Sequence, residues 1–190
     1  MKQLSADVVI IGTGAAGMMA ALTAKERDVD VLVVGKAAVG RGTCTSFAGG
    51  YFSSSTPNFS KEQHNAATLE VGRDINDLQL VNLITQRGTE CLEKLRSMGV
   101  GLLPMDNGYS VNNQNNEKLI SGYPLVNDMR RAMDEYGIKS LSGFHCLELI
   151  IEDNAVAGVM GVTAEGPAVI SAPSVIIATG GAGAIYLRTD

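Results

Sequence analysis

Hydrophobic positions near the start of the chain predict a strand, a helix and a second strand in quick succession. Residues 6–11 form a short apolar run rich in β-branched residues, typical of a strand buried in a parallel sheet. Residues 15–28, rich in alanine, methionine and leucine, predict a helix, and residues 29–34 predict a second buried strand. The three elements make a βαβ unit within about 30 residues, for which a right-handed crossover is expected.

Polar caps followed by apolar positions at helical spacing predict two helices in the middle of the chain. Before them, residues 35–58 are rich in glycine, serine and threonine, and a stretch of this length is usually functional or disordered. Ser60 with Gln63 has the pattern of a capping box that opens a short helix. Asn76 with Gln79 repeats the pattern and opens a longer helix through about residue 98, which Gly88 is expected to interrupt. The expected apolar side of this longer helix consists of Leu80, Ile84, Cys91, Leu92 and Leu95.

The second half of the chain predicts mostly strands. Residues 100–123 are loop-like, and Pro124 suits the first turn of a helix over residues 124–136, which Gly137 would end. Apolar segments at 138–151, 155–163 and 167–171, with a turn at Asp153-Asn154, predict an antiparallel meander. Residues 174–177 then read as one more buried strand that runs into a glycine turn.

These elements predict an α/β fold. Its Rossmann-like parallel sheet would be built from the two ends of the chain, with a helical excursion at about 55–105 and a β-meander at about 140–172. A length of 190 residues is enough for one domain with a real hydrophobic core.

Composition narrows the possible function classes. The net charge of -5, with no visible lysine or arginine cluster, argues against a nucleic-acid partner. No apolar run approaches the roughly 18 residues that span a bilayer. The chain starts with a short polar lead and no secretory signal, so a cytoplasmic location is expected. Three dispersed cysteines and two histidines predict no metal site.

The first functional motif is Gly-Thr-Gly-Ala-Ala-Gly, directly between the first predicted strand and helix. Gly12 would permit the tight turn, Gly14 the approach of a pyrophosphate, and Gly17 the close packing of helix on strand. Free N–H groups at a helix N-terminus attract phosphate, so Ala15 and Ala16 belong to the same predicted site. The strand before the motif and the helix after it are the context that a dinucleotide-binding turn requires.

The second strand lacks the residue that an NAD-binding fold usually carries. Such a fold normally ends this strand with an acid that holds the ribose hydroxyls, and here Gly35 stands in that place, followed by Lys36. The missing acid argues against an NAD(P)-dependent dehydrogenase, which stays an alternative.

Residues 35–52 resemble the flavoprotein family of succinate dehydrogenase and fumarate reductase, which includes L-aspartate oxidase. Gly35-Lys36 and Ala48-Gly49-Gly50 fall at the intervals where that family has Ser-Lys and a Gly-Gly against the flavin ring. The membrane-bound members carry a histidine here that bonds covalently to FAD, and this chain has Thr43. The resemblance therefore implies FAD held non-covalently, and favours an aspartate-oxidase-like or soluble fumarate-reductase-like enzyme. A flexible serine-glycine linker is the alternative for residues 40–50.

A third glycine turn, after the last strand, matches the same family. Ala178-Thr179-Gly180 would bring bare backbone close to the cofactor, and Cys146 would lie in a strand that passes the adenine. His145 is expected to be structural. The predicted cofactor-binding residues are Gly12, Gly14, Ala15, Ala16, Gly17, Gly35, Lys36, Gly42, Thr43, Cys44, Thr45, Ala48, Gly49, Gly50, Cys146, Ala178, Thr179 and Gly180.

The resemblance covers the whole chain but only part of the family's length. The family's capping domain, its substrate-binding histidine and arginines and its C-terminal flavin contacts would all follow the third turn, so residues 1–190 are expected to be a partial FAD-binding domain with no catalytic residue. The implied function is flavin-dependent hydride transfer on a small dicarboxylate, with this segment alone inactive. A redox partner subunit or a homo-oligomer is possible. The alternative is a non-catalytic or split flavoprotein module that contributes a cofactor-binding surface to a larger complex.

Overall fold

The computed structural model describes residues 2–73, 75–112 and 122–188, which divide between two compact units. The first unit takes residues 1–47 and 129–190, and the second takes residues 48–128. The first unit is thus assembled from both ends of the chain, as the pattern of buried strands predicts.

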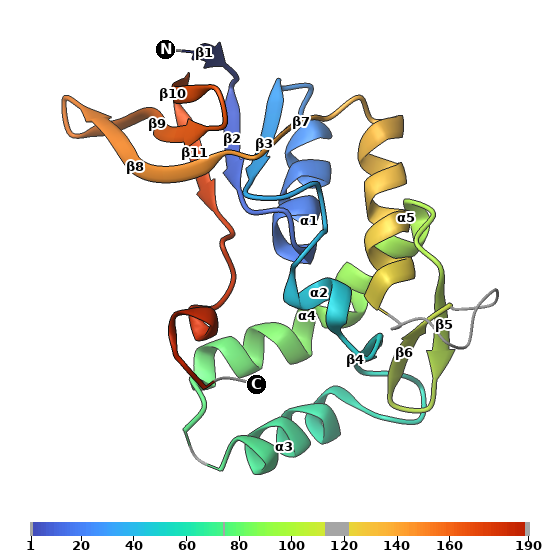
Figure 1. Cartoon of the computed structure of the whole chain (residues 1–190). Coiled ribbons are helices and arrows are strands. Elements are labelled where there is room, and N and C mark those ends of the chain that lie inside the picture. The colour runs from blue at the N-terminus through green and yellow to red at the C-terminus, as the bar shows by residue number, and fades with distance from the viewer. Residues whose placement is uncertain (1, 74, 113–121, 189–190) are drawn as a thin grey trace. The chain divides into compact units, whose positions relative to one another are not determined.

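A four-stranded parallel sheet lies at the centre of the first unit, in the order β11-β2-β3-β7. Its strands are β2 (Val8–Ile11), β3 (Val31–Gly35), β7 (Lys139–Ser142) and β11 (Ser174–Ile177). Helix α1 (Ala15–Lys25) connects β2 to β3 and packs against these strands (Figure 1), so the predicted βαβ unit is confirmed. The sequence pattern assigned β7 to the meander, and this was wrong: β7 pairs with β3.

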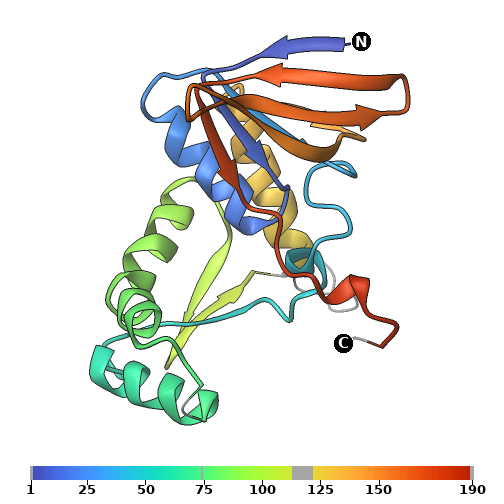
Figure 2. The same cartoon turned by 90° about the vertical axis from the view of Figure 1, so that its left-hand side faces the viewer.

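A second sheet of four strands has the order β1-β10-β9-β8 (Figure 2). Its strands are β1 (Lys2–Ser5), β8 (His145–Glu152), β9 (Ala155–Thr163) and β10 (Gly166–Ser171). The antiparallel meander β8-β9-β10 is confirmed, and Asp153 and Asn154 make the turn with φ of 49° and 62°. The polar lead proves to be a strand, because β1 pairs in parallel with the edge of β10. An exposed edge strand needs no apolar pattern, which is why the sequence did not indicate it.

The core of the first unit has two sides because side chains alternate along the buried strands. Val9 and Ile11 of β2 pack in one cluster with Val159 of β9 and Ile170 of β10, between the two sheets. Ile10, between them, is fully buried on the opposite side, where α1 buries Met18 and Leu22. Burial on both faces explains why β2 and β3 have continuous apolar sequences. The prediction that β11 is also buried was wrong, because β11 lies at the edge of the sheet and its Ile177 is 62% exposed.

The second unit combines a small antiparallel sheet with two packed helices. Its elements are β4 (Tyr51–Ser53), α3 (Lys61–Gly72), α4 (Leu78–Ser97), β5 (Leu102–Met105) and β6 (Gly108–Val111), with strand order β4-β6-β5. The β5-β6 hairpin lies where the sequence predicted a loop. Each strand has only four residues, and the sheet is completed by β4, more than fifty residues earlier, so no local pattern reveals it.

Three helical elements remain: two short ones, and one longer helix that belongs to both units. Helix α2 (Cys44–Phe47) is one turn inside the glycine-rich stretch, and η1 (Gly183–Ile185) is a turn of 3-10 helix after the last strand. Helix α5 (Gly122–Glu135) begins in the second unit and ends in the first. Pro124 lies in its first turn and Gly137, with φ of 65°, follows its end, as predicted. No helix in the described residues has the length and apolarity to cross a membrane.

The helix caps confirm one prediction and correct another. At α3, the Ser60 hydroxyl accepts from the Gln63 N–H (3.2 Å) while the Gln63 side chain accepts from the Ser60 N–H (2.7 Å), a complete capping box. At α4, Asn76 is not the cap: the Asp77 carboxylate accepts from the N–H groups of Gln79 and Leu80. Helix α4 also continues through Gly88, at a cost of about 1 kcal/mol relative to alanine.

The buried side of α4 differs from the predicted apolar side by one position. Leu92 and Leu95 are buried as expected, but Cys91 is exposed. Leu80 and Ile84 are each 56% exposed, and Val81 and Thr85 are buried in their place. Thr85 satisfies its hydroxyl by donating to the Val81 carbonyl at 2.9 Å, which lets a polar residue occupy a buried position. Hydrophobicity alone therefore selected the wrong register over the first two turns.

A buried histidine in α3 predicts a pH-dependent stability of the second unit. His64 is 3% exposed, its ring lies 5.7 Å from that of Phe59, and its Nδ1 has no hydrogen-bond partner among the described residues. Burial lowers the pKa of His64, because desolvation disfavours the imidazolium. The unfolded chain therefore binds a proton more readily than the folded chain.

This difference in proton binding sets the direction in which the free energy of unfolding changes with pH. The free energy of unfolding should be highest above a pH of about 6.5 and fall below it, by no more than about 1.4 kcal/mol per pH unit from this group. Urea unfolding at pH 7.5 and pH 5.5 measures the effect, and His64→Leu should remove this part of it. The matched control, His145→Leu at an exposed position of β8, should keep it. An equal pH dependence in wild type and His64→Leu would refute the assignment.

Candidate functional site

The first glycine turn connects β2 to α1 and is fixed by close backbone packing. Gly12 has a φ of 123°, and a Cβ there would lie 2.1 Å from the carbonyl oxygen of Ala178. A Cβ on Gly17 would lie 2.0 Å from the carbonyl oxygen of Gly12. Ala178 also donates its N–H to the Ile11 carbonyl at 2.8 Å. The first and third glycine turns therefore touch, as the sequence predicted for a shared site.

Gly14 differs from Gly12 and Gly17 because the fold does not require a glycine at this position. Its φ of -78° and ψ of -177° are extended backbone that any residue can adopt, and it is the N-cap of α1. The nearest atom to a Cβ on Gly14 would be the Thr45 Oγ1 at 3.4 Å, an ordinary van der Waals contact. An alanine side chain would therefore fit at this position, and its absence leaves the backbone at the start of the helix uncovered.

The start of α1 is suited electrostatically to an anion. Among the described residues, the N–H groups of Gly14, Ala16 and Gly17 have no hydrogen-bond partner, and Gly17 is buried. No acidic residue occupies the first turn. Unpaired N–H groups and the positive end of the helix dipole together favour a phosphate.

The middle glycine-rich stretch folds back onto this turn. The Ala15 N–H donates to the Thr45 Oγ1 at 3.0 Å, and the Gly40 N–H donates to the Thr13 carbonyl at 3.0 Å. Thr43 shapes the loop internally, since its hydroxyl donates to the Gly40 carbonyl at 3.0 Å. The predicted residues Gly42, Thr43, Cys44 and Thr45 belong to this loop, and Gly42 has a φ of 63°.

The glycine at the end of β3 has a packing partner in the first turn. A Cβ on Gly35 would lie 2.6 Å from the Thr13 methyl group, and Thr13 is 8% exposed. Any side chain at this position, including the acid of an NAD-binding fold, would therefore have to displace Thr13. Thr13 was not among the predicted site residues. Its position between Gly12 and Gly14 was the one sequence feature that could have indicated a place in the site. Lys36 follows Gly35 and is exposed.

The remaining predicted residues lie at three other places. Ala48, Gly49 and Gly50 belong to the second unit, where the carbonyls of Ala48 and Gly50 accept from the N–H groups of Gly122 and Val111. Thr179 and Gly180 follow Ala178 directly and are exposed.

Cys146 lies in β8, where its side chain packs against the core between the two sheets. Burial raises the pKa of the Cys146 thiol, so it stays protonated and unreactive near neutral pH. No group of three histidine, cysteine or carboxylate side chains suited to a metal gathers anywhere in residues 2–73, 75–112 and 122–188.

The parallel sheet, the glycine turn before α1 and the meander define an α/β dinucleotide-binding fold of the flavoprotein type. Residues 7–189 match the family model described as FAD binding domain, so the chain belongs to this family and its cofactor is FAD. The predicted resemblance to the succinate dehydrogenase and fumarate reductase family and the predicted fold class are confirmed.

Relatives over almost the whole chain include two oxidoreductases. The chain is 33% identical to an L-aspartate oxidase of Mycobacterium tuberculosis, over 97% of this chain and 37% of that protein. It is 30% identical to one of the subunits of the fumarate reductase (CoM/CoB) of Methanothermobacter marburgensis, over 97% of this chain and 36% of that protein. The chain thus spans little more than a third of the length of these relatives.

Among solved structures, the fold matches a quinol fumarate reductase of Escherichia coli with a TM-score of 0.81 at 22% identity, over 98% of this chain and 34% of that one. It also matches a 3-ketosteroid-delta4-(5alpha)-dehydrogenase of Rhodococcus jostii RHA1 with a TM-score of 0.81 at 21% identity, over 95% and 47%. At these identities the likeness establishes the fold alone.

Proposed function

We propose that this chain is the FAD-binding part of a flavin-dependent oxidoreductase that acts on a small dicarboxylate. The observation that carries the cofactor site is Gly14, a position where the fold tolerates a side chain and none is present. In this proposal the unpaired N–H groups of Gly14, Ala16 and Gly17 bind the pyrophosphate. Gly35 and Lys36 lie along the ribose, and Ala178, Thr179 and Gly180 close the side of the cofactor.

The middle loop positions the N-terminus of α1 rather than taking part in chemistry. Thr45 holds the Ala15 N–H, which orients the remaining free N–H groups of the turn toward the pyrophosphate. Thr43 offers a hydroxyl that already donates to Gly40, and it has no imidazole nitrogen to bond to the flavin. These contacts support non-covalent binding. Bound FAD would supply hydride transfer between a C–C or C–N bond of the substrate and the flavin.

The dicarboxylate is proposed from the names of the relatives, an L-aspartate oxidase and a fumarate reductase. The fumarate reductase relative is named as one part of a multi-chain enzyme, which supports a redox partner for the full-length protein. We assign no catalytic residue to residues 1–190, and we propose that the segment alone has no turnover.

Absorption spectroscopy tests the cofactor and its mode of attachment. The purified protein should show flavin bands, and acid precipitation should release the flavin into the supernatant, because no covalent bond holds it. Flavin that stays with the precipitate would refute the non-covalent assignment. A colourless native protein that binds NADH would overturn the FAD site itself.

Anaerobic addition of L-aspartate or succinate to the full-length protein tests the reaction class, with bleaching of the flavin bands by one of them expected. Flavin that neither compound bleaches would instead support a non-catalytic flavoprotein module.

A further inference from the structure

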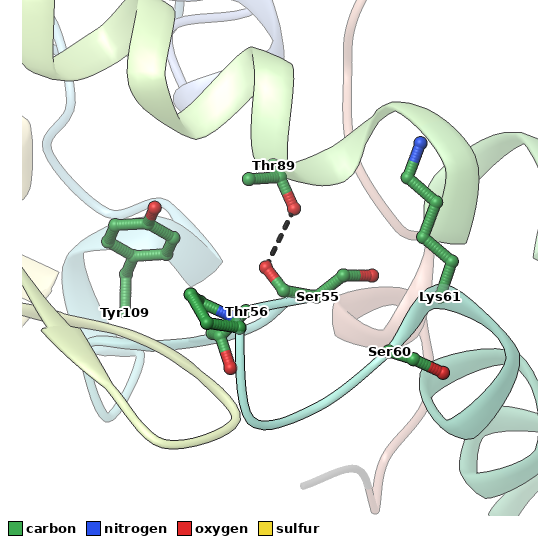
Figure 3. Close-up of a pocket in the computed structure, with 7 residues that line it drawn as sticks. Ser55, Thr56, Ser60, Lys61, Thr89 and Tyr109 are labelled. Atoms are coloured by element: carbon green, nitrogen blue, oxygen red, sulfur yellow. Dashed lines mark hydrogen bonds between the residues drawn. The ribbon is translucent and has the colours of Figure 1, made fainter.

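A pocket apart from the glycine turns lies within the second unit, at the start of α3. An open pocket of about 330 Å³ is lined by Ser55, Thr56, Ser60, Lys61, Thr89 and Tyr109 (Figure 3). Its lining residues come from the segment before α3, from α3 and α4, and from β6. We propose that this pocket binds a small oxyanion, the phosphate or carboxylate group of a small molecule.

Four of the five hydroxyl groups in the pocket are already engaged within the protein. Thr56 donates to the Asp106 carbonyl and Tyr109 donates to the Glu93 carboxylate. The hydrogen bond to Glu93 raises the pKa of Tyr109, so its hydroxyl stays neutral. The fifth residue, Ser55, is 8% exposed and its Oγ has no hydrogen-bond partner among the described residues.

The Ser55 hydroxyl is held in place by its own backbone. The Thr89 Oγ1 donates to the Ser55 carbonyl at 2.9 Å, and the Ser54 Oγ lies 2.7 Å from the same Thr89 oxygen. Beyond Ser55, two backbone hydrogen bonds between Thr56 and Phe59 close the loop, at 2.9 Å and 3.1 Å. A buried hydroxyl without a partner destabilises the folded chain, and a hydrogen bond to a ligand oxygen would relieve this cost. In Figure 3 this hydroxyl points to the side of the pocket where Lys61 lies.

The charged side chain that lines the pocket is a cation, Lys61, and the Glu93 carboxylate behind Tyr109 is paired with Arg96 at 3.0 Å. Lys61 is the first residue of α3, a helix of 12 residues, so its N–H lies at the positive end of the helix dipole. Its ammonium group makes no ion pair among the described residues. Glu62 does not line the pocket, and a hydrogen bond from Ser60 lowers its pKa, so it is a nearby negative charge. Its presence should weaken the site without abolishing it.

Titration calorimetry of the full chain with inorganic phosphate, with succinate, and with chloride at matched ionic strength tests the proposal. Phosphate or succinate should give saturable heat that chloride does not, and the comparison identifies which oxyanion group the site prefers. Lys61→Gln should weaken binding about tenfold or more, and Ser55→Ala by about three- to tenfold. Glu62→Gln should tighten it. Lys2→Gln, the same substitution in β1 of the first unit, should leave it unchanged.

Thermal unfolding separates a ligand-binding hydroxyl from a structural one. Since the Ser55 Oγ makes no hydrogen bond, Ser55→Ala should melt without ligand at or above the temperature of the wild type, while losing affinity. The proposal is overturned if neither phosphate nor succinate gives saturable heat, or if Ser55→Ala and Lys61→Gln bind as the wild type does. This site does not rest on the FAD function, and either result leaves that function intact.

Discussion

Replacing Gly14 with alanine is expected to leave the chain folded and to weaken FAD binding about tenfold to a hundredfold. The added methyl group would make only ordinary contacts, the nearest being 3.4 Å from the Thr45 Oγ1, so the expected loss of stability is that of an alanine N-cap, about 1 kcal/mol. The same methyl would fill the space through which a pyrophosphate reaches the N–H groups of α1. Filling a well-packed contact costs about 1–3 kcal/mol, which corresponds to this loss of affinity. Gly14→Val should abolish binding and leave far-UV dichroism nearly intact.

Flavin content after purification and fluorescence titration of the apoprotein with FAD measure the effect. Gly88→Ala is the matched control, because Gly88 lies in the middle of α4 and a Cβ there would meet nothing within 4 Å. It should bind FAD normally and be more stable by about 0.5–1 kcal/mol. Unchanged FAD affinity in Gly14→Ala would place the pyrophosphate somewhere else.

Replacing Gly17 with alanine should have the opposite profile and destabilise the fold by about 3 kcal/mol, the upper end of the usual cost of overpacking. The new Cβ would lie 2.0 Å from the Gly12 carbonyl oxygen, far inside van der Waals contact. The turn cannot move away easily, because the Gly12 N–H donates to the Val34 carbonyl at 2.9 Å and Ala178 packs on its other side. Helix α1 would have to shift from a sheet face where its buried side chains are closely packed.

Urea unfolding of Gly17→Ala beside Gly14→Ala and Gly88→Ala measures this difference directly. The three variants share one chemical change, so the midpoints report only the surroundings of each glycine. Equal stability of Gly17→Ala and Gly14→Ala would mean that α1 does not pack on the turn at this distance.

Local patterns were enough to predict the elements whose backbone and core contacts lie close in sequence. The βαβ unit follows from continuous apolar strands around a glycine turn, and the meander follows from short strands joined at Asp153-Asn154. The capping box at Ser60 is a contact between residues three apart, so its pattern is complete within the sequence. The glycines at positions 12 and 17 were predicted for the reasons that the packing confirms.

Long-range pairing decided the features that local patterns missed. β7 joins the parallel sheet through β3, more than a hundred residues earlier, and β1 depends on β10 near the other end of the chain. The neighbouring elements decide which face of α4 is buried. Val81 and Thr85 are therefore buried, while Leu80 is not.

The sequence by itself predicted a dinucleotide, because bare backbone at a glycine turn and a helix N-terminus are encoded within a few adjacent residues, and the resemblance of residues 35–52 implied that it is FAD. The sequence also predicted separate roles for Gly12, Gly14 and Gly17 within the first turn. Only the tertiary structure showed the partners that distant segments supply: a Cβ on Gly12 would meet Ala178, and one on Gly35 would meet Thr13. These contacts join segments far apart in the chain, which no spacing of residues along one segment contains.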